Sequence, residues 1–308
     1  MSQSTDRILM VRPATFRSNE QTTANNYFQQ VKAVDANTDL LAEAQREFDA
    51  LVQLLRSHGV QVGVVQDNDR YDTPDALFPN NHVSFHKGGT QVSYSMYAPN
   101  RRQERELPLT DVLQTLGVAM GEKHSLAFFE KANIYLEGTG SLVLDRANGI
   151  AYASLSGRTH REALLHWCQL MGFKPMMFRS FHSVQSVRQP IYHTNVMMCV
   201  GSHFAVLCAM CIDNEAERHS VVDELEDTGH HIIYINEEQM GRFAGNMLEL
   251  KNSHGETLIV MSQSAHDILT ADQLNRLSSF GKLIAADLHI IEEHGGGSAR
   301  CMIAEVFV

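Results

Sequence analysis

The end of the chain contains the residues whose types and spacing most clearly suggest chemistry. Cys301 follows the run GGGSAR at residues 295–300. Consecutive glycines let a backbone turn tightly and approach a ligand where a Cβ would collide. A neighbouring arginine, or backbone N–H groups gathered in a turn, favours the thiolate, which is the nucleophilic form of cysteine. The segment therefore predicts a cysteine nucleophile; the structural alternative is a small apolar residue that begins a last strand over residues 302–308.

A cysteine nucleophile needs a nearby base and a group that orients this base. Histidine suits the role because its ordinary pKa of about 6.5 lies close to the working pH. His193 precedes an apolar run and Glu137 precedes a glycine, although each is weak evidence alone in a chain with 16 histidines. Four loop segments share polar residues beside an apolar strand, and we expect the fold to gather them: residues 78–82, 135–140, 192–195 and 295–301.

Short apolar runs and amphipathic helical patterns alternate along the chain and must position these loops. The periodicity predicts a strand over residues 8–11, a helix over 40–58 ended by Gly59, and a strand over 60–65. Units of strand, turn, strand, helix and strand then recur about every fifty residues, which favours an α/β fold with radial or stacked repeats. No composition break marks a linker, so we expect one domain; a division near Gly140 stays open.

Composition bounds the class of protein. The 308 residues carry a net charge of −11, which argues against nucleic acid or an anionic membrane as the main partner. Five cysteines at irregular positions do not form a disulfide framework. The N-terminus lacks a signal-peptide pattern, and no apolar run approaches the ~18 residues of a membrane span. We expect a cytoplasmic protein; Cys208 and Cys211 have metal-like spacing but no second pair, so we expect no metal.

Taken together, these segments resemble the guanidino-group-modifying (pentein) superfamily of arginine deiminases, dimethylarginine dimethylaminohydrolases and amidinotransferases. The resemblance covers almost the whole chain. It implies a five-bladed α/β propeller built from ββαβ-type repeats around a pseudo-fivefold axis, as one catalytic domain over residues 1–308 without a cofactor. It also implies that Cys301 is the nucleophile, His193 the general acid/base and Glu137 the active-site carboxylate.

Two basic segments also resemble the superfamily. The sequence SGRT at residues 156–159 is similar to its Ser-x-Arg-Thr stretch, which implies that Arg158 receives the substrate α-carboxylate. Residues 98–104 resemble a second basic loop of the dimethylarginine dimethylaminohydrolases. The pattern leaves open whether Arg101 or Arg102 faces the site.

The departures from the superfamily pattern bear on the substrate. Members that bind a guanidinium cation hold it with two aspartates, and this chain has Asn81 and Asn195 at those positions, with Asn80 beside the first. The usual Glu-Gly-Gly-Asp is EGTG at residues 137–140, which removes a third acid. A carboxylate only accepts hydrogen bonds, whereas an amide both donates and accepts. The amides therefore favour a neutral ureido group, which also presents both a carbonyl and N–H donors.

Within the superfamily the chain most resembles the citrulline-hydrolase-like branch. The shared segments are FPNN at 78–81, LEGTGS at 136–141 and HTN at 193–195, together with an early loop over residues 12–26 that we expect to cover the site. The resemblance implies a hydrolase that converts citrulline to ornithine, carbon dioxide and ammonia through a covalent thio-intermediate. An amidinotransferase or guanidine deiminase stays open, as do a non-catalytic propeller that binds a partner and a homodimer.

Overall fold

The computed structural model describes residues 2–23, 25–29, 39–119 and 121–308. Within them the chain forms a mixed α/β fold with five three-stranded sheets and one two-stranded hairpin. In every three-stranded sheet the middle strand pairs antiparallel with one neighbour and parallel with the other.

Four of these sheets use consecutive strands, so each is built from one local stretch of chain. They are β3 (Val83–His86), β4 (Thr90–Ser93) and β5 (Lys123–Ser125); β6 (Val143–Asp145), β7 (Ile150–Ser154) and β8 (Lys174–Phe178); β11 (Met198–Val200), β12 (Phe204–Leu207) and β13 (His231–Tyr234); and β14 (Leu248–Lys251), β15 (Thr257–Ser262) and β16 (Lys282–Ala286).

The fifth sheet joins the two ends of the described chain. Strand β1 (Arg7–Arg12) lies between β17 (Ala304–Glu305) and β2 (Gln61–Gln66). It pairs antiparallel with β17 and parallel with β2. The same alternation of antiparallel and parallel pairs therefore recurs in a sheet whose strands lie almost the whole chain apart.

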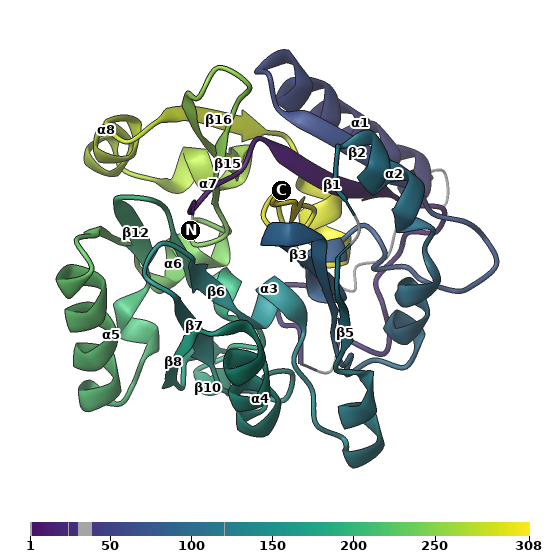
Figure 1. Ribbon diagram of the computed structural model, residues 1–308. Coiled ribbons are helices and arrows are strands. Elements are labelled where there is room, and N and C mark those ends of the chain that lie inside the picture. Colours follow the sequence, from purple (N-terminus) through teal and green to yellow (C-terminus); the bar gives the residue numbers. More distant parts are fainter. Residues whose placement is uncertain (1, 24, 30–38, 120) are drawn as a thin grey trace.

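Helices lie around the outside of the sheets, and Figure 1 shows α1, α4, α5 and α8 at the periphery with α3 near the centre. The α-helices are α1 (Leu40–Ser57), α2 (Leu109–Thr115), α3 (Gly138–Ser141), α4 (Arg161–Met171), α5 (Glu215–Asp227), α6 (Glu237–Gly241), α7 (Gln263–Ile268) and α8 (Ala271–Ser278). Short 3-10 helices lie between these elements. Strands follow η1 (Pro79–Asn81), η2 (Lys87–Gly89) and η5 (Thr194–Val196), and α-helices follow η3 (Asn100–Glu106), η4 (Ala127–Ala132) and η6 (Ala209–Cys211).

Helix α1 shows how the sequence produces these elements. The Asp39 side chain caps its first turn by accepting from the Ala42 N–H, and Gly59 follows its end with a φ of 83°, which suits glycine. Its apolar residues recur at helical spacing and are buried against the adjoining sheets, which accounts for the predicted span of residues 40–58; they are Ala44, Phe48, Leu51, Val52 and Leu55.

Two strands are shorter than the apolar runs that contain them. The expected strand over residues 302–308 reduces to β17, because Ile303 closes a turn by donating to the Arg300 carbonyl. The run from Asn195 enters the sheet only at Met198, because η5 places residues 194–196 in a 3-10 turn. In both places the turn holds polar residues just ahead of the strand.

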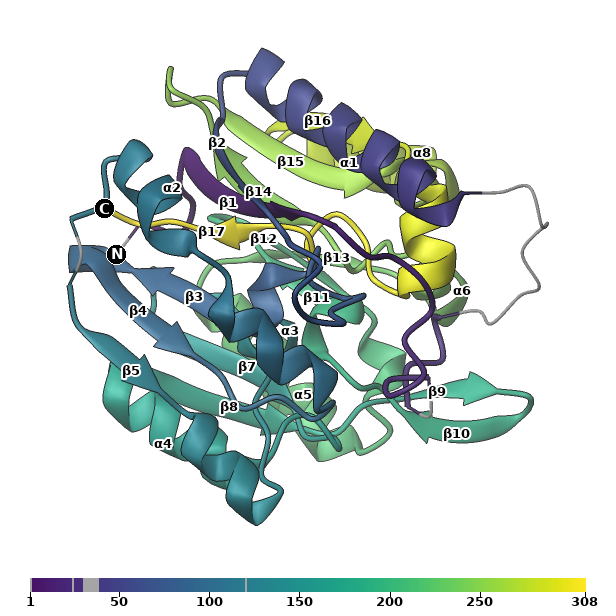
Figure 2. The same ribbon diagram turned by 90° about the vertical axis from the view of Figure 1, so that its right-hand side faces the viewer.

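The hairpin of β9 (Phe181–Val184) and β10 (Val187–Pro190) projects from the body of the molecule, as Figure 2 shows. Across the described residues, no helix combines the length and hydropathy that crossing a bilayer requires.

Candidate active site

Cys301 lies in a turn that a buried carboxylate supports. Its backbone N–H donates to the Ser298 carbonyl at 2.9 Å, and the Ser298 hydroxyl donates to Glu292 Oε1 at 2.5 Å. Glu292 belongs to η7, a π-helix over Ile291–Gly295. Its second oxygen accepts from the Ser264 hydroxyl at 2.6 Å. The turn that holds Cys301 is therefore supported by a π-helical segment, a type of distortion that is frequent at functional sites.

The glycine run has a steric reason. Gly296 has a φ of 66°, in the left-handed region that favours glycine. A Cβ on Gly297 would lie 2.9 Å from the Phe78 ring, and one on Gly295 would meet the same ring at 2.9 Å. Phe78 can therefore pack against the backbone beside Cys301 only because these side chains are absent.

Two side-chain amides face the sulfur of Cys301. Asn195 Nδ2 lies 3.5 Å from Sγ and Asn246 Nδ2 lies 3.4 Å from it. The Arg300 guanidinium instead donates to the Ile303 carbonyl and to Glu305, each at 2.9 Å. The charge of the neighbouring arginine is thus directed to Glu305, and amide donors contact the sulfur. Asn246 was not singled out from the sequence.

His193 and Glu137 form a buried pair. His193 Nε2 lies 2.8 Å from Glu137 Oε2, and Arg158 Nη1 lies 3.5 Å from the same oxygen. Burial lowers the pKa of His193, against the opposing effect of Glu137. Burial would raise the pKa of Glu137, but Arg158 and then His193 outweigh burial and lower it. The pair is therefore an ionised carboxylate and a neutral imidazole near neutral pH, with Arg158 balancing the carboxylate charge.

Gly140 makes room for this imidazole. A Cβ at this position would lie 2.7 Å from His193 Nδ1 and 2.5 Å from Asn81 Nδ2. Any larger residue would displace one of these groups. Gly140 thus stands where the superfamily pattern Glu-Gly-Gly-Asp has an aspartate, and its backbone packs directly against His193 and Asn81.

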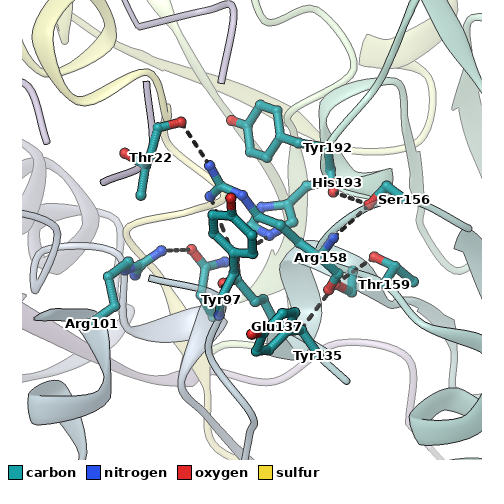
Figure 3. Close-up of polar contacts among 12 residues, drawn as sticks. Thr22, Tyr97, Arg101, Tyr135, Glu137, Ser156, Arg158, Thr159, Tyr192 and His193 are labelled. Atoms are coloured by element: carbon teal, nitrogen blue, oxygen red, sulfur yellow. Dashed lines mark hydrogen bonds and ion pairs between the residues drawn. The ribbon is translucent and has the colours of Figure 1, made fainter. Parts of the chain in front are cut away.

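Arg158 is inserted between aromatic rings and the early loop. Its guanidinium donates to the Thr22 carbonyl at 3.2 Å and to Asn25 Oδ1 at 3.0 Å. It lies 4.8 Å from the centre of the Tyr192 ring, and Figure 3 shows it extending toward Thr22 beside Tyr97 and Tyr192. The early loop thus lies over the site through these contacts. Its predicted role toward a substrate carboxylate stays a prediction.

The structure distinguishes the two arginines of the basic loop. Arg101 is buried, donates through Nη1 to Asn81 Oδ1 at 2.8 Å, and forms a bidentate pair with Glu104. Arg102 is partly exposed and donates to the Met96 and Tyr97 carbonyls. Arg101 is therefore the arginine that faces the site.

The asparagine pair beside Arg101 is linked internally. Asn81 Nδ2 donates to Asn80 Oδ1 at 2.9 Å, while Asn80 Nδ2 has no hydrogen-bond partner among the described residues. Asn195 Oδ1 is likewise buried without a partner. Unpaired polar atoms in a protein interior are rare, so each marks a place where a ligand or water is expected.

One pocket collects most of these side chains. Cys301, His193, Asn81, Arg101 and Arg158 line it together, whereas Asn80, Arg102, Asn195 and Glu137 stand behind or outside its wall. In the structure its free volume is only about 10 Å³, roughly the room for one water. A substrate must therefore displace the side chains that cover the pocket.

The pocket also contains an acid that the sequence analysis did not identify. Asp75 lines it, accepts from Asn19 Nδ2 at 2.7 Å, and lies 3.6 Å from Arg101 Nε. Burial raises the pKa of Asp75, and Arg101 opposes that rise. Asp75 is therefore a third buried carboxyl group at the site, beside Glu137, which pairs with Arg158, and Glu104, which pairs with Arg101.

The sequence model of the family described as N,N dimethylarginine dimethylhydrolase, eukaryotic, matches residues 12–308. No curated protein matches the chain. Among solved structures the chain resembles apo ArgZ, an arginine dihydrolase from the ornithine–ammonia cycle in cyanobacteria, with a TM-score of 0.74 at 15% identity; the match covers 98% of this chain and 40% of ArgZ.

Two further structures match over nearly their full length. A substrate-bound variant of the isolated N-terminal domain of ArgZ gives a TM-score of 0.74 at 15% identity, with 98% of each chain covered. A dimethylarginine dimethylaminohydrolase variant with an S-methyl-L-thiocitrulline adduct gives 0.64 at 16% identity, covering 97% of this chain and 98% of that one. These likenesses show a shared fold.

Proposed function

Because the chain belongs to the N,N dimethylarginine dimethylhydrolase family of the pentein superfamily, and is thus a hydrolase acting on C–N bonds, we propose that it hydrolyses citrulline. The products are ornithine, carbon dioxide and ammonia. The single observation that carries the substrate assignment is the amide at the sulfur: Asn195 lies against Cys301 where the superfamily's guanidinium-binding aspartate is expected.

The hydrogen-bonding capacity of Asn195 fits a ureido group. Its Nδ2 donor faces Cys301, and its Oδ1 is a buried acceptor without a partner. A ureido carbon attacked by Cys301 places a carbonyl oxygen near the donor and N–H groups near the acceptor. An aspartate there would set lone pairs against the carbonyl oxygen and leave a buried charge unpaired.

The chemistry follows from the Cys301, His193 and Glu137 positions. The Cys301 thiol loses its proton to neutral His193, and the sulfur forms a bond to the ureido carbon. The bond from that carbon to the ornithine nitrogen breaks, and His193 returns the proton to the departing amine. The S-carbamoyl enzyme is then attacked by water, which His193 deprotonates. This step restores the thiol and releases carbamic acid, which decomposes to carbon dioxide and ammonia.

The charged groups of the pocket suit the two ends of an α-amino acid. We assign the α-carboxylate to Arg158, which would exchange its contacts to Thr22 and Asn25 for the substrate. Asp75 is the acid available to the α-ammonium group. Arg101 is already committed to Glu104 and Asn81, so it supports the wall of the pocket.

We further propose that the five three-stranded sheets are the blades of one propeller domain over residues 1–308. The pairing of β17 with β1 supports a closed ring of sheets. Asn81, Asn195 and Cys301 each lie just ahead of an edge strand that pairs antiparallel with the middle strand of its sheet, and the three sheets are different. These positions support a site on the axis of the propeller.

A second candidate is hydrolysis of arginine, as in the arginine dihydrolase ArgZ. Asp75 is the observation that favours it, because its neighbouring cation Arg101 already forms a bidentate pair with Glu104, which leaves Asp75 able to accept from a guanidinium. Incubation with citrulline, arginine, methylarginines and agmatine separates the candidates when ornithine, ammonia and citrulline are measured individually. Release of ornithine from citrulline alone supports the proposal; turnover of arginine with no turnover of citrulline overturns it.

Replacing Asn81 and Asn195 together by aspartate is expected to reduce the preference for citrulline over arginine by about 10- to 100-fold, because each mismatched buried polar group costs about 1–3 kcal/mol. The ratio of kcat/KM for the two substrates measures the effect. Arg101 Nη1 lies 2.8 Å from Asn81 Oδ1, so its positive charge can stabilise an aspartate carboxylate at position 81. Asn214→Asp is the matched control, because Asn214 caps α5 where aspartate is equally suitable. An unchanged ratio would contradict the amide argument.

As the pH is lowered, kcat/KM for citrulline is expected to begin to fall only below pH 6.5. His193 must be neutral to take the thiol proton, and burial lowers its pKa, so the neutral form persists as the pH falls from 7 to 6. Activity is then lost only as the pH falls through that lowered pKa. Measurement of kcat/KM against pH, with enzyme stability checked at each point, tests this. An acid limb at or above pH 6.5 would exclude the neutral imidazole.

A further inference from the structure

We propose that Asn246 is a further catalytic residue, whose side-chain amide stabilises the Cys301 thiolate that attacks the substrate. Asn246 is fully buried and stands just ahead of β14, in a sheet that contributes none of the residues expected from the sequence. The role in turnover depends on the function proposed above, whereas the contact with the sulfur does not.

The orientation of the Asn246 amide is determined by backbone groups. Its Oδ1 accepts from the Arg300 backbone N–H at 3.1 Å, and its Nδ2 donates to the Asn195 carbonyl at 2.9 Å. A backbone N–H can only donate and a carbonyl can only accept, so a flipped amide would lose both bonds. The second hydrogen of Nδ2 is therefore left for Cys301 Sγ, 3.4 Å away.

The sulfur requires such a donor. Cys301 is only 4% exposed, so bulk water has little access to its anion. The Arg300 charge is directed to Glu305, and His193 uses Nε2 for Glu137. Hydrogen bonds to an ionised acceptor are stronger than those to a neutral one, so an amide that donates to sulfur favours the thiolate over the thiol.

Asn195 and Asn246 differ in the hydrogen-bonding groups that they have left for a substrate. Asn195 has an unpartnered Oδ1 and can exchange contacts with a substrate. Asn246 has both N–H groups engaged and its oxygen bonded, so it has no donor left for a substrate. Asn246 is thus dedicated to the sulfur, while Asn195 serves both the sulfur and the reacting group.

The test replaces Asn246 by aspartate and, separately, by leucine. Both remove the donor to the sulfur and to the Asn195 carbonyl; aspartate keeps the acceptor for Arg300, and leucine removes the donor without adding a negative charge. The full-length variants and wild type are alkylated with iodoacetamide across a pH series, and modification of Cys301 is measured by mass spectrometry. We expect alkylation at pH 7 to slow by about 10- to 100-fold, with the profile displaced to higher pH. For citrulline, kcat should fall by a similar factor while KM changes less. Asn214→Asp should match wild type in both assays.

Alkylation of Asn246→Asp or Asn246→Leu at the wild-type rate and with the wild-type pH profile would overturn the proposal. If neither variant folds, the side-chain amide signals of Asn246 are compared by NMR in wild type and Cys301→Ala; unchanged signals would overturn it equally. If wild type turns over no substrate of the panel, the citrulline assignment fails. The alkylation comparison still decides the role of Asn246, because iodoacetamide needs no substrate site.

Discussion

Replacing Cys301 by alanine is expected to reduce citrulline turnover by about 10,000-fold or more, to the background rate. The sulfur is the only protein group that bonds to the ureido carbon in the proposed reaction, and no hydroxyl or second thiol lines the pocket within the described residues except the Tyr192 phenol. Burial raises the pKa of that phenol, so it cannot substitute as a nucleophile. Ornithine release measures the loss, and mass spectrometry of the denatured protein should show no substrate-dependent adduct.

Cys199→Ala is the matched control for this variant. Cys199 is also buried, but it belongs to β11 and lies outside the pocket that contains His193. It should retain turnover and still form the adduct on Cys301. Citrulline should still bind to Cys301→Ala, as measured by calorimetry, because the groups assigned to its α-carboxylate and α-ammonium ends are unchanged. Undiminished turnover by Cys301→Ala would remove the cysteine from the mechanism.

Replacing His193 by alanine is expected to lower kcat for citrulline by about 100- to 10,000-fold, the range that a positioned acid and base contributes. An alkyl amine leaves poorly without a proton, and the attacking water also loses its base. A substrate whose leaving group is a thiolate does not need that proton. S-methyl-L-thiocitrulline should therefore still form an adduct on Cys301 in the variant, more slowly because His193 no longer takes the thiol proton, and the adduct should persist because its hydrolysis is blocked.

The control for this prediction is His266→Ala, since His266 lies in α7 and pairs only with the exposed Asp267. It should keep the wild-type rate with both substrates. Rapid turnover of citrulline by His193→Ala would require another acid and base. Failure to form any adduct with the thiolate-leaving substrate would show that Cys301 forms no reactive thiolate without His193.

The local elements were predictable because their causes are local. Alternating apolar residues, glycine turns and the Asp39 cap determine α1 and the paired strands of the four sequential sheets. The two-residue strand β17 was not predictable at its observed length, since its limits depend on the turn through Ile303. Its pairing with β1 is also a contact between distant segments, which no local pattern specifies.

The site was predictable where a residue belonged to a recognisable segment. Arg101 and Arg102 are adjacent in η3, and only the packing of this turn decides which one is buried. Asp75 and Asn246 carry no motif of their own. Asn246 could nevertheless have been found from the repeat, because it stands two residues before β14 as Asn81 stands two residues before β3. The repeat predicts a fifth polar loop ahead of β14, in addition to the four polar loops at residues 78–82, 135–140, 192–195 and 295–301.

The sheet that joins β1 to β17 has a consequence for how the protein becomes active. Cys301 lies three residues before β17, so its place depends on a contact between segments that are almost a full chain length apart. Contacts of such long sequence separation form slowly, because the entropy of closing the loop is lost before the contact is gained. In a newly made chain whose four sequential sheets have formed, Cys301 would still lack its fixed position until β17 pairs with β1. Competence for catalysis and completion of folding would then arrive in the same event.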